Sequence, residues 1–388
     1  MEKVRFGIVG CGNMGTGHAK NFIAGKIPNG CITAVCDVDP DKFAFFKENF
    51  GDSINYYTDA EEMYKSGDID LSLICTPHYI HPDLAILAMD YGLHCIVEKP
   101  AGVYTLQVRE MLERHKTSDK VLGIMFCQRN NPAFKKMREM IQAGKIGEIK
   151  RTNWIITDWY RTQYYYDSGS WRATWAGEGG GVLYNQAPHQ LDLWQWIIGM
   201  MPTKIRAFCH NGKWHDIEVE DDVTCYCEYP NGATGVFVTC TADAPGTNRF
   251  EVSGTLGTLI FENNKLYYKE LVTNERDHCY TCEAGFKRPE CKPTVEVPLE
   301  GENTNHSGIC NNIIDAIQNG AEVYARAEEG IRGVELANAM HLSSWLNREI
   351  ELPFTEELDN LFYEELKKRI AISKPHNVTK KNTVEAQN

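Results

Sequence analysis

Three glycines near the N-terminus have the spacing of a phosphate-binding turn. Gly10, Gly12 and Gly15 form GxGxxG in the stretch GIVGCGNMGTGH, directly after an apolar run and at the start of a helical pattern. In such a turn the first glycine permits a tight bend, the second lets the backbone approach a pyrophosphate, and the third lets helix and strand pack closely. The amides at the start of the helix, where Asn13 and Met14 stand, can then bind phosphate oxygens. The pattern predicts a dinucleotide site.

Asp37 indicates which dinucleotide is bound. It ends the apolar run ITAVCD, about twenty residues beyond the glycines, where a carboxylate can accept hydrogen bonds from the adenosine ribose. The chain continues with VDPD, and this acidic segment would repel a 2′-phosphate. We therefore expect NAD rather than NADP. The alternative role of Asp37 is that of a turn or helix-capping residue.

A lysine and a histidine are the candidates for proton and charge chemistry. Lys99 follows the apolar run HCIV, between Glu98 and Pro100, which would fix the turn that holds it. His189 lies in GEGGGVLYNQAPHQLD on a segment with helical spacing, and Asn185 shares its helix face. An imidazole can accept a proton from an alcohol near neutral pH, and an ammonium stabilises negative charge on its oxygen. Taken alone, each residue could also be structural, as a solvated lysine at a strand end and a hydrogen-bonded core histidine.

Fourteen cysteines are distributed along the chain, many inside apolar runs such as VTCYCEY. This is typical of reduced, buried thiols in a cytoplasmic protein. The segment HCYTCEAGFKRPEC differs, because Cys279, Cys282 and Cys291 could join His278 as soft ligands of zinc. A second closely spaced ligand pair is missing there. We therefore expect a loop with incidental thiols and no metal, with a zinc site as the alternative.

The elements that must position these residues follow a regular order in the first third of the chain. Short apolar runs alternate with helical patterns, as in a doubly wound parallel sheet, whose ligands bind at the carboxyl ends of the strands. From about Ile149 onward, strand-like runs are separated by turns such as Asn231-Gly232 and Asn263-Asn264, which favours antiparallel pairs. We predict an α/β protein with an N-terminal Rossmann parallel sheet in residues 1–128. A C-terminal α+β domain on a mostly antiparallel sheet would occupy residues 129–372, and a disordered tail residues 373–388.

Composition excludes several classes of partner. A net charge of −13 opposes binding to nucleic acid or to anionic membranes, both of which require a positive surface. No apolar run approaches the length of a membrane span, and the stretch MEKVRFGIVG does not have the pattern of a signal peptide. We therefore expect a cytoplasmic protein that acts on a small molecule.

Several motifs together resemble the glucose-fructose oxidoreductase and inositol dehydrogenase family, also called Gfo/Idh/MocA. They are GIVGCGNMG, CTPHYIH, EKP, GEGGGVLYNQAPHQLD and LANAMHLSSWLNREIELP, between about Val4 and Phe354. The resemblance implies an NAD-binding domain and a sheet domain that binds substrate and that many members use to form homo-oligomers. It places Lys99 and His189 at the family's active-site lysine and catalytic histidine. Asn185 departs from the family, because several members have aspartate there, and an amide cannot hold the proton or balance Lys99.

The same resemblance adds further residues to the expected site. Thr76, Pro77 and His81 match a segment at the nicotinamide and its ribose, and Trp171 and Arg172 match a pair beside the nicotinamide or substrate. The full set expected to bind NAD is Gly10, Gly12, Asn13, Met14, Gly15, Asp37, Thr76, Pro77, His81, Glu98, Lys99, Gln128, Trp171 and Arg172. The set expected to bind a polyol ring is Asp158, Tyr160, Trp175, Asn185 and His189, with Arg161, Tyr164 and Glu178 as further candidates.

These residues predict an oxidoreductase that removes hydride from a secondary ring hydroxyl and passes it to NAD. Sequences with NQxPHxLD look like enzymes that act on sugars and glycosides, some of them at carbon 3, so we expect a hexose or glycoside as substrate. An inositol dehydrogenase is one alternative. The others are an NAD-dependent glycosidase that works by oxidation and elimination, and a sugar sensor without catalysis.

Overall fold

A computed structural model of the chain describes residues 2–374. Of the tail predicted to be disordered, residues 375–388 lie outside the described part. The first two tail residues are held in place, since Ser373 and Lys374 both hydrogen-bond to the carboxylate of Glu218, the backbone amide of Lys374 at 3.0 Å. None of the described helices is both long and apolar enough to cross a membrane.

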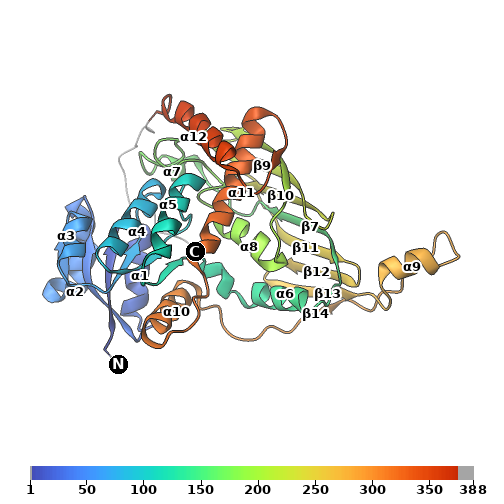
Figure 1. Cartoon of the computed structure of the whole chain (residues 1–388), viewed down its shortest axis with the longest axis horizontal. Coiled ribbons are helices and arrows are strands. Elements are labelled where there is room, and N and C mark those ends of the chain that lie inside the picture. The colour runs from blue at the N-terminus through green and yellow to red at the C-terminus, as the bar shows by residue number, and fades with distance from the viewer. Residues whose placement is uncertain (1, 375–388) are drawn as a thin grey trace.

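The N-terminal half is built on a six-stranded parallel sheet with the order β3-β2-β1-β4-β5-β6 (Figure 1). Its central strands are apolar and buried, because crossover helices cover both faces of such a sheet. The order reverses between β1 and β4, and ligands of doubly wound sheets bind at this point. The strands are β1 (Val4–Val9), β2 (Gly30–Cys36), β3 (Asn55–Tyr57), β4 (Leu71–Ile74), β5 (His94–Val97) and β6 (Leu122–Ile124).

The helices of this half connect successive strands, as the alternating pattern predicts. They are α1 (Asn13–Ile23), α2 (Ala44–Phe50), α3 (Ala60–Lys65), α4 (His81–Asp90) and α5 (Thr105–Lys116), with short 3-10 turns η1 (Pro40–Phe43), η2 (Gly51–Ser53), η3 (His78–Ile80) and η4 (Cys127–Asn130).

The second half contains a nine-stranded sheet with the order β14-β13-β12-β11-β7-β10-β9-β8-β15. Among its described pairs, β7 and β10 are parallel and the others antiparallel, which confirms the mostly antiparallel sheet. The strands are β7 (Ile149–Ile156), β8 (Lys204–Asn211), β9 (Glu220–Glu228), β10 (Thr234–Cys240), β11 (Asn248–Gly254), β12 (Gly257–Glu262), β13 (Lys265–Glu270), β14 (Val295–Glu296) and β15 (Ile350–Glu351).

Helices α6, α8 and α11 lie on one face of this sheet (Figure 1), above a core that includes Trp154 and Phe237. On the opposite face Ile155, Phe208 and Tyr226 are each about half exposed. The helices of this half are α6 (Pro132–Gln142), α7 (Gln163–Tyr166), α8 (Pro188–Ile198), α9 (Glu275–Thr281), α10 (Asn305–Asn319), α11 (Ala327–Leu346) and α12 (Glu356–Ile370).

Two C-terminal helices belong to the packing of the first half. Ile309, Ile313 and Ile314 of α10 lie in the same buried cluster as the strands of the parallel sheet. Helix α11 is shared, because its Val334 packs in that cluster and its Leu336 in the core of the nine-stranded sheet. The two halves therefore meet along a seam that runs through α11.

Helix α9 and its flanking loops project from the sheet edge as an arm, residues 271–294 (Figure 1). Its aromatic residues Tyr280 and Phe286 are 81% and 103% exposed. Exposed large apolar side chains on a projecting segment commonly mark a contact with another molecule.

Candidate functional site

The glycine turn has the geometry that a dinucleotide requires. Gly10 has a positive φ of 95°, and a β-carbon on it would lie 2.7 Å from the carbonyl oxygen of Cys75. A β-carbon on Gly15 would lie 2.0 Å from the carbonyl oxygen of Gly10. At Gly12, by contrast, a β-carbon would meet nothing within 4 Å. The first and third glycines are thus required by the fold, while the second leaves open space at the start of α1, where a pyrophosphate fits.

Asp37 lies beside this turn at the end of β2. Its carboxylate accepts hydrogen bonds from the backbone amides of Cys11, at 2.8 Å, and Asp39, at 2.9 Å. It therefore has the turn-forming role that we considered as its alternative. A carboxylate has about four acceptor positions, so two bonds leave room for the hydroxyls of a ribose.

The EKP loop follows β5, and its charged residues are buried. Burial alone would raise the pKa of the Glu98 carboxyl, but the hydrogen bond to His18 at 2.7 Å and nearby positive charges lower it to about 2. Burial lowers the pKa of Lys99, whose Nζ donates to the backbone carbonyl of Asn185 at 2.9 Å. This bond joins the parallel-sheet half to the segment before α8.

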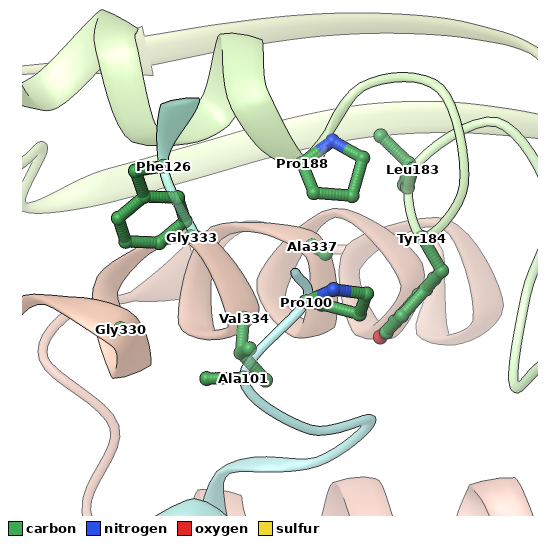
Figure 2. A pocket seen from close by; sticks show the side chains of 10 residues that line it. All are labelled: Pro100, Ala101, Phe126, Leu183, Tyr184, Pro188, Gly330, Gly333, Val334 and Ala337. Carbon is green, nitrogen blue, oxygen red and sulfur yellow. The ribbon is translucent and has the colours of Figure 1, made fainter. Parts of the chain in front are cut away.

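Apolar packing holds that loop in place. Figure 2 shows a small cavity in which Pro100 and Ala101 face Val334 of α11, with Tyr184 and Pro188 from the segment of Asn185 alongside. Its walls are nearly all carbon, so it offers a sugar no hydrogen-bonding groups. We interpret it as a packing seam that fixes Lys99 and Asn185 relative to each other.

Beside the EKP loop, buried His18 and Glu98 and half-buried His306 form a group whose potential ligand atoms are all within 4.8 Å of one another. Among residues 2–374 this is the group with the spacing of a metal site, and Cys279, Cys282 and Cys291 do not form one. His18 and Glu98 already share a hydrogen bond, and Lys99 supplies a neighbouring positive charge. We therefore interpret the group as a hydrogen-bonded support for the loop, and the absence of a metal stays a prediction.

His189 is the second residue of α8 and is 9% exposed. Burial, and then the charge of Lys99, lower its pKa well below 6.5, so the imidazole is neutral at pH 7. Its Nε2 lies 3.8 Å from Sγ of Cys127, and its Nδ1 is buried without a partner in the described structure. A neutral imidazole with a free nitrogen can accept a proton.

Other buried polar atoms near these residues also lack partners. They include Oγ1 of Thr76, at the end of β4, and Oε1 of Gln190, whose Nε2 lies 3.5 Å from Oε1 of Gln128. Native structures rarely leave buried polar groups unpaired, except where a ligand or water binds. Unpaired polar atoms on both the parallel-sheet half and helix α8 are therefore available to a cofactor and a polar substrate.

His81 joins the chain segments that follow β4 and β5. One ring nitrogen lies 2.8 Å from the carbonyl oxygen of Pro100 and the other 2.7 Å from that of Thr76. Pro77 lies in the loop between β4 and η3. Trp171 belongs to the second half, and its ring contacts that of His78 edge to face, with the two ring centroids 6.1 Å apart. The predicted cofactor residues from both halves are thus neighbours.

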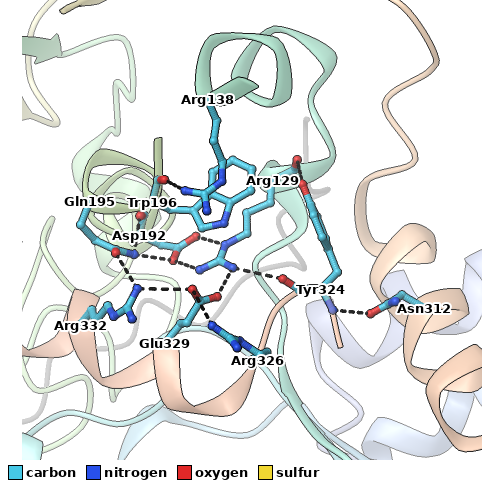
Figure 3. Close-up of polar contacts among 10 residues, drawn as sticks. All are labelled: Arg129, Arg138, Asp192, Gln195, Trp196, Asn312, Tyr324, Arg326, Glu329 and Arg332. Atoms are coloured by element: carbon cyan, nitrogen blue, oxygen red, sulfur yellow. Dashed lines mark hydrogen bonds and ion pairs between the residues drawn. The ribbon is translucent and has the colours of Figure 1, made fainter. Parts of the chain in front are cut away.

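A buried ion network fixes the helix that carries His189. Arg129, directly after Gln128, donates from Nε to Asp192 of α8 at 2.8 Å and forms an ion pair with Glu329 of α11 (Figure 3). The Arg129 side chain is fully buried. Because both charges of such a pair must be satisfied in the interior, the network ties the end of β6, α8 and α11 to one geometry.

The predicted substrate residues do not all meet. Trp175 is 3% exposed and packs edge to face on His341 and Trp345, so we correct its predicted role from substrate contact to core residue. Asp158 and Tyr160 lie in the exposed segment after β7.

Tyr165, the residue after Tyr164, contacts Asn185 and Arg172, although its place in the sequence did not indicate this. Tyr165 donates to Oδ1 of Asn185 at 3.2 Å and accepts a hydrogen bond from Arg172 at 2.7 Å. The guanidinium of Arg161 lies 5.0 Å from the Tyr165 ring. His18, Cys127 and His306 were also missed, and only the three-dimensional arrangement brings them to the EKP loop.

Comparison with known proteins gives matches over both halves. The model of the oxidoreductase family with an NAD-binding Rossmann fold matches residues 4–126, and that of the GFO/IDH/MocA C-terminal domain matches residues 134–260. Inositol 2-dehydrogenase of Rhizobium meliloti is 25% identical over 353 residues, which is 90% of this chain and 99% of the relative. Levoglucosan dehydrogenase of Pseudarthrobacter phenanthrenivorans is 25% identical over 293 residues, 67% of this chain and 74% of the relative.

Solved structures agree with this assignment. WlbA dehydrogenase from Chromobacterium violaceum, solved with NADH and UDP-GlcNAcA, has a TM-score of 0.78 at 25% identity and covers 92% of this chain and 97% of its own. The family matches cover both the glycine turn and helix α8, which carries His189. The relatives are named as dehydrogenases, in agreement with an oxidoreductase family. The chain therefore belongs to the Gfo/Idh/MocA family, as an NAD-binding oxidoreductase among relatives named as sugar and polyol dehydrogenases.

Proposed function

We propose that this enzyme oxidises a secondary ring hydroxyl of a hexose or glycoside, at carbon 3, with Lys99 and His189 at the reacting centre. The observation that carries this proposal is the neutral, buried imidazole of His189, whose Nδ1 has no partner in the described structure and on which the charge of nearby Lys99 acts. The departure at Asn185 favours a sugar or glycoside over the inositols named for several relatives.

In the proposed reaction, NAD supplies the acceptor for the hydride that leaves the carbon atom. The hydroxyl proton passes to His189, which is suited to take it because burial keeps the imidazole unprotonated. The ammonium of Lys99 orients the hydroxyl and stabilises the negative charge that develops on its oxygen. Asn185 orients the sugar through its amide.

The test is a panel of hexoses, glycosides and inositols incubated with the purified enzyme and NAD. We expect NADH absorbance with a hexose or glycoside, and a keto group at carbon 3 when the product is analysed by NMR. His189→Ala should reduce turnover about a hundred- to ten-thousand-fold while leaving NAD affinity nearly unchanged. Lys99→Met should also reduce turnover, with less recovery at alkaline pH, since hydroxide replaces a base but not a fixed positive charge.

Each alternative predicts another result in the same assay. NADH formed only with inositols would indicate an inositol dehydrogenase, and cleavage of a glycoside without net NADH would indicate a glycosidase. NAD and sugar binding without either product would indicate a sensor. Near-normal turnover by His189→Ala across the pH range would overturn the proposed mechanism.

We further propose that the enzyme forms a homo-oligomer and works in the cytoplasm on a small sugar, with no nucleic acid as partner. Support for the oligomer comes from the half-exposed Ile155, Phe208 and Tyr226 on the outer face of the nine-stranded sheet. Support for the compartment comes from the fourteen cysteines, all of them free. Sedimentation of the purified protein tests the first part of this proposal.

A further inference from the structure

The chain lacks a carboxylate at position 185, yet a buried carboxylate lies against that residue. Glu178 precedes the three glycines and is 2% exposed. Its Oε1 accepts a hydrogen bond from Nδ2 of Asn185, and its Oε2 accepts one from the backbone amide of Ala173 at 2.7 Å. The guanidinium of Arg172 lies 3.8 Å from Oε1.

The backbone around Glu178 is built to point this side chain inward. Gly179, directly after it, has a positive φ of 84°, and a β-carbon there would lie 2.3 Å from Val103. On the other side, the ring of His78 lies 3.1 Å from the carbonyl oxygen of Glu178. The backbone of Glu178 and Gly179 is therefore held against His78 and Val103 of the parallel-sheet half.

This contact determines which way the amide of Asn185 faces. Because Nδ2 donates to the carboxylate, Oδ1 is the atom that receives hydrogen bonds from Tyr165 and from Gln186, both at 3.2 Å. The backbone carbonyl of the same residue accepts from Lys99 at 2.9 Å. Glu178 is thus connected to the active-site lysine through a single residue.

The charges in this cluster complement one another. Lys99 and Arg172 bring two positive charges into a buried region. Glu178 supplies a negative charge there, and its carboxylate contacts Asn185 and lies 3.8 Å from Arg172. Burial raises the pKa of Glu178, and Arg172 and the two hydrogen bonds oppose this. Glu98, the residue before Lys99, is a second carboxylate whose charge acts on this lysine. An unpaired charge in such a place would be costly, so these charges must be balanced together.

We propose that Glu178 is a positioning residue that replaces the missing carboxylate of position 185, by fixing the orientation of the Asn185 amide and by balancing, together with Glu98, the charges of Lys99 and Arg172. This inference rests on the proposed function. The carboxylate thereby keeps Oδ1 of Asn185 as the acceptor for Tyr165 and Gln186.

The test is an exchange of these two groups in the full-length enzyme. Glu178→Gln places two amides in contact and removes the carboxylate at Asn185, while Glu98 still neighbours Lys99. We expect kcat to fall roughly 10- to 100-fold with little change in the KM for NAD, as for loss of a hydrogen bond to a charged group. Asn185→Asp puts two carboxylates in contact, which must share a proton, so its activity and thermal stability should fall more at pH 8 than at pH 5.5.

The double variant Glu178→Gln/Asn185→Asp restores one acid and one amide, and should recover at least tenfold in kcat over either single variant. Such coupling identifies a direct interaction between the two positions. Its melting temperature should also lose the pH dependence of Asn185→Asp, a result that needs no substrate.

The matched control is Glu335→Gln. Glu335 is also buried, has a pKa raised by burial, and accepts a backbone hydrogen bond, from Phe354 at 2.8 Å, but it lies at the far side of α11 near Arg109. Its replacement should lower stability and leave kcat unchanged.

Equal effects of Glu178→Gln and the control, or a double variant no better than the single variants in both kcat and melting, would overturn the inference. Failure of the wild-type enzyme to turn over any sugar would contradict the proposed function instead. In that case the melting experiment alone tests whether Glu178 and Asn185 interact directly.

Discussion

Substitutions of the glycines in the nucleotide turn can separate effects on NAD binding from effects on the folding of the protein. Gly12 has φ of −72° and ψ of −159°, which any residue can adopt, and a β-carbon there meets no atom within 4 Å. Gly12→Ala should therefore leave the melting temperature of the NAD-free protein within a degree or two. The added methyl group occupies the space through which a pyrophosphate approaches the start of α1.

The magnitude follows from the bonds that this approach makes. Backbone amides at a helix start form hydrogen bonds to a charged group, each worth about 1.5–3 kcal/mol. Loss of one such bond corresponds to a rise in the Kd for NAD of about 10- to 150-fold. Gly15→Ala should behave differently, because its β-carbon would lie 2.0 Å from the carbonyl oxygen of Gly10 and must displace backbone. We expect it to unfold at lower temperature whether or not NAD is present.

Gly17→Ala is the matched control. It lies on the exposed side of the same helix, also with nothing within 4 Å, and alanine favours a helix over glycine by about 1 kcal/mol. This variant should bind NAD normally and melt slightly higher. Calorimetric titration with NAD, together with melting curves, measures all three variants. If Gly12→Ala bound NAD as tightly as the wild-type protein, the assignment of this turn to the pyrophosphate would be wrong.

Three further predictions concern other parts of the molecule. Asp37→Ser combined with Val38→Arg should shift the ratio of the Kd values for NAD and NADP toward NADP, and a wild-type protein that binds both equally would contradict the role of Asp37. Arg129→Met should lower the free energy of unfolding in urea by about 3–5 kcal/mol, because it leaves the buried carboxylates of the network unpaired. Burial lowers the pKa of His306 to about 4, so the stability it contributes is present above pH 6.5 and is lost as pH falls toward 4. Between pH 7 and pH 4.5, the melting temperature of His306→Asn should therefore fall less than that of the wild-type protein. Melting temperatures that fall in parallel in the two proteins would contradict this.

The strands of the parallel sheet could be predicted because each is an apolar run followed by turn residues. The pairing of β7 with β10 could not, since the pattern within a strand does not state which neighbour it meets. The turn at Asn263-Asn264 was recognised, but the strand after it, KLYYKE, was not, because two lysines and a glutamate lower its apolar content. Helix α12 was missed too, although Thr355 caps it and acidic residues fill its first turn.

In the site, the sequence indicates which residue types are present but not which of them touch. Lys99 and His189 could be placed because a motif marks each. Glu178 was expected to bind a hydroxyl of the substrate, and its contact with Asn185 depends on the turn made by the glycines that separate them. Tyr164 and Tyr165 are adjacent and identical in type, so the sequence does not indicate which of them contacts Asn185, and the structure shows this contact for Tyr165.

The packing of α10 into the first core has a consequence for the synthesis of the chain. Ile309, Ile313 and Ile314 leave the ribosome only after all of the nine-stranded sheet except its last strand, yet they close the apolar cluster of a domain whose strands came first. Until then the edge of that cluster is exposed, as surface on which unfinished chains can associate or chaperones can bind. A ribosome that stalls before residue 305 therefore carries a nucleotide domain with an open core, and truncated chains of this enzyme should be aggregation-prone even when every NAD-binding residue is present.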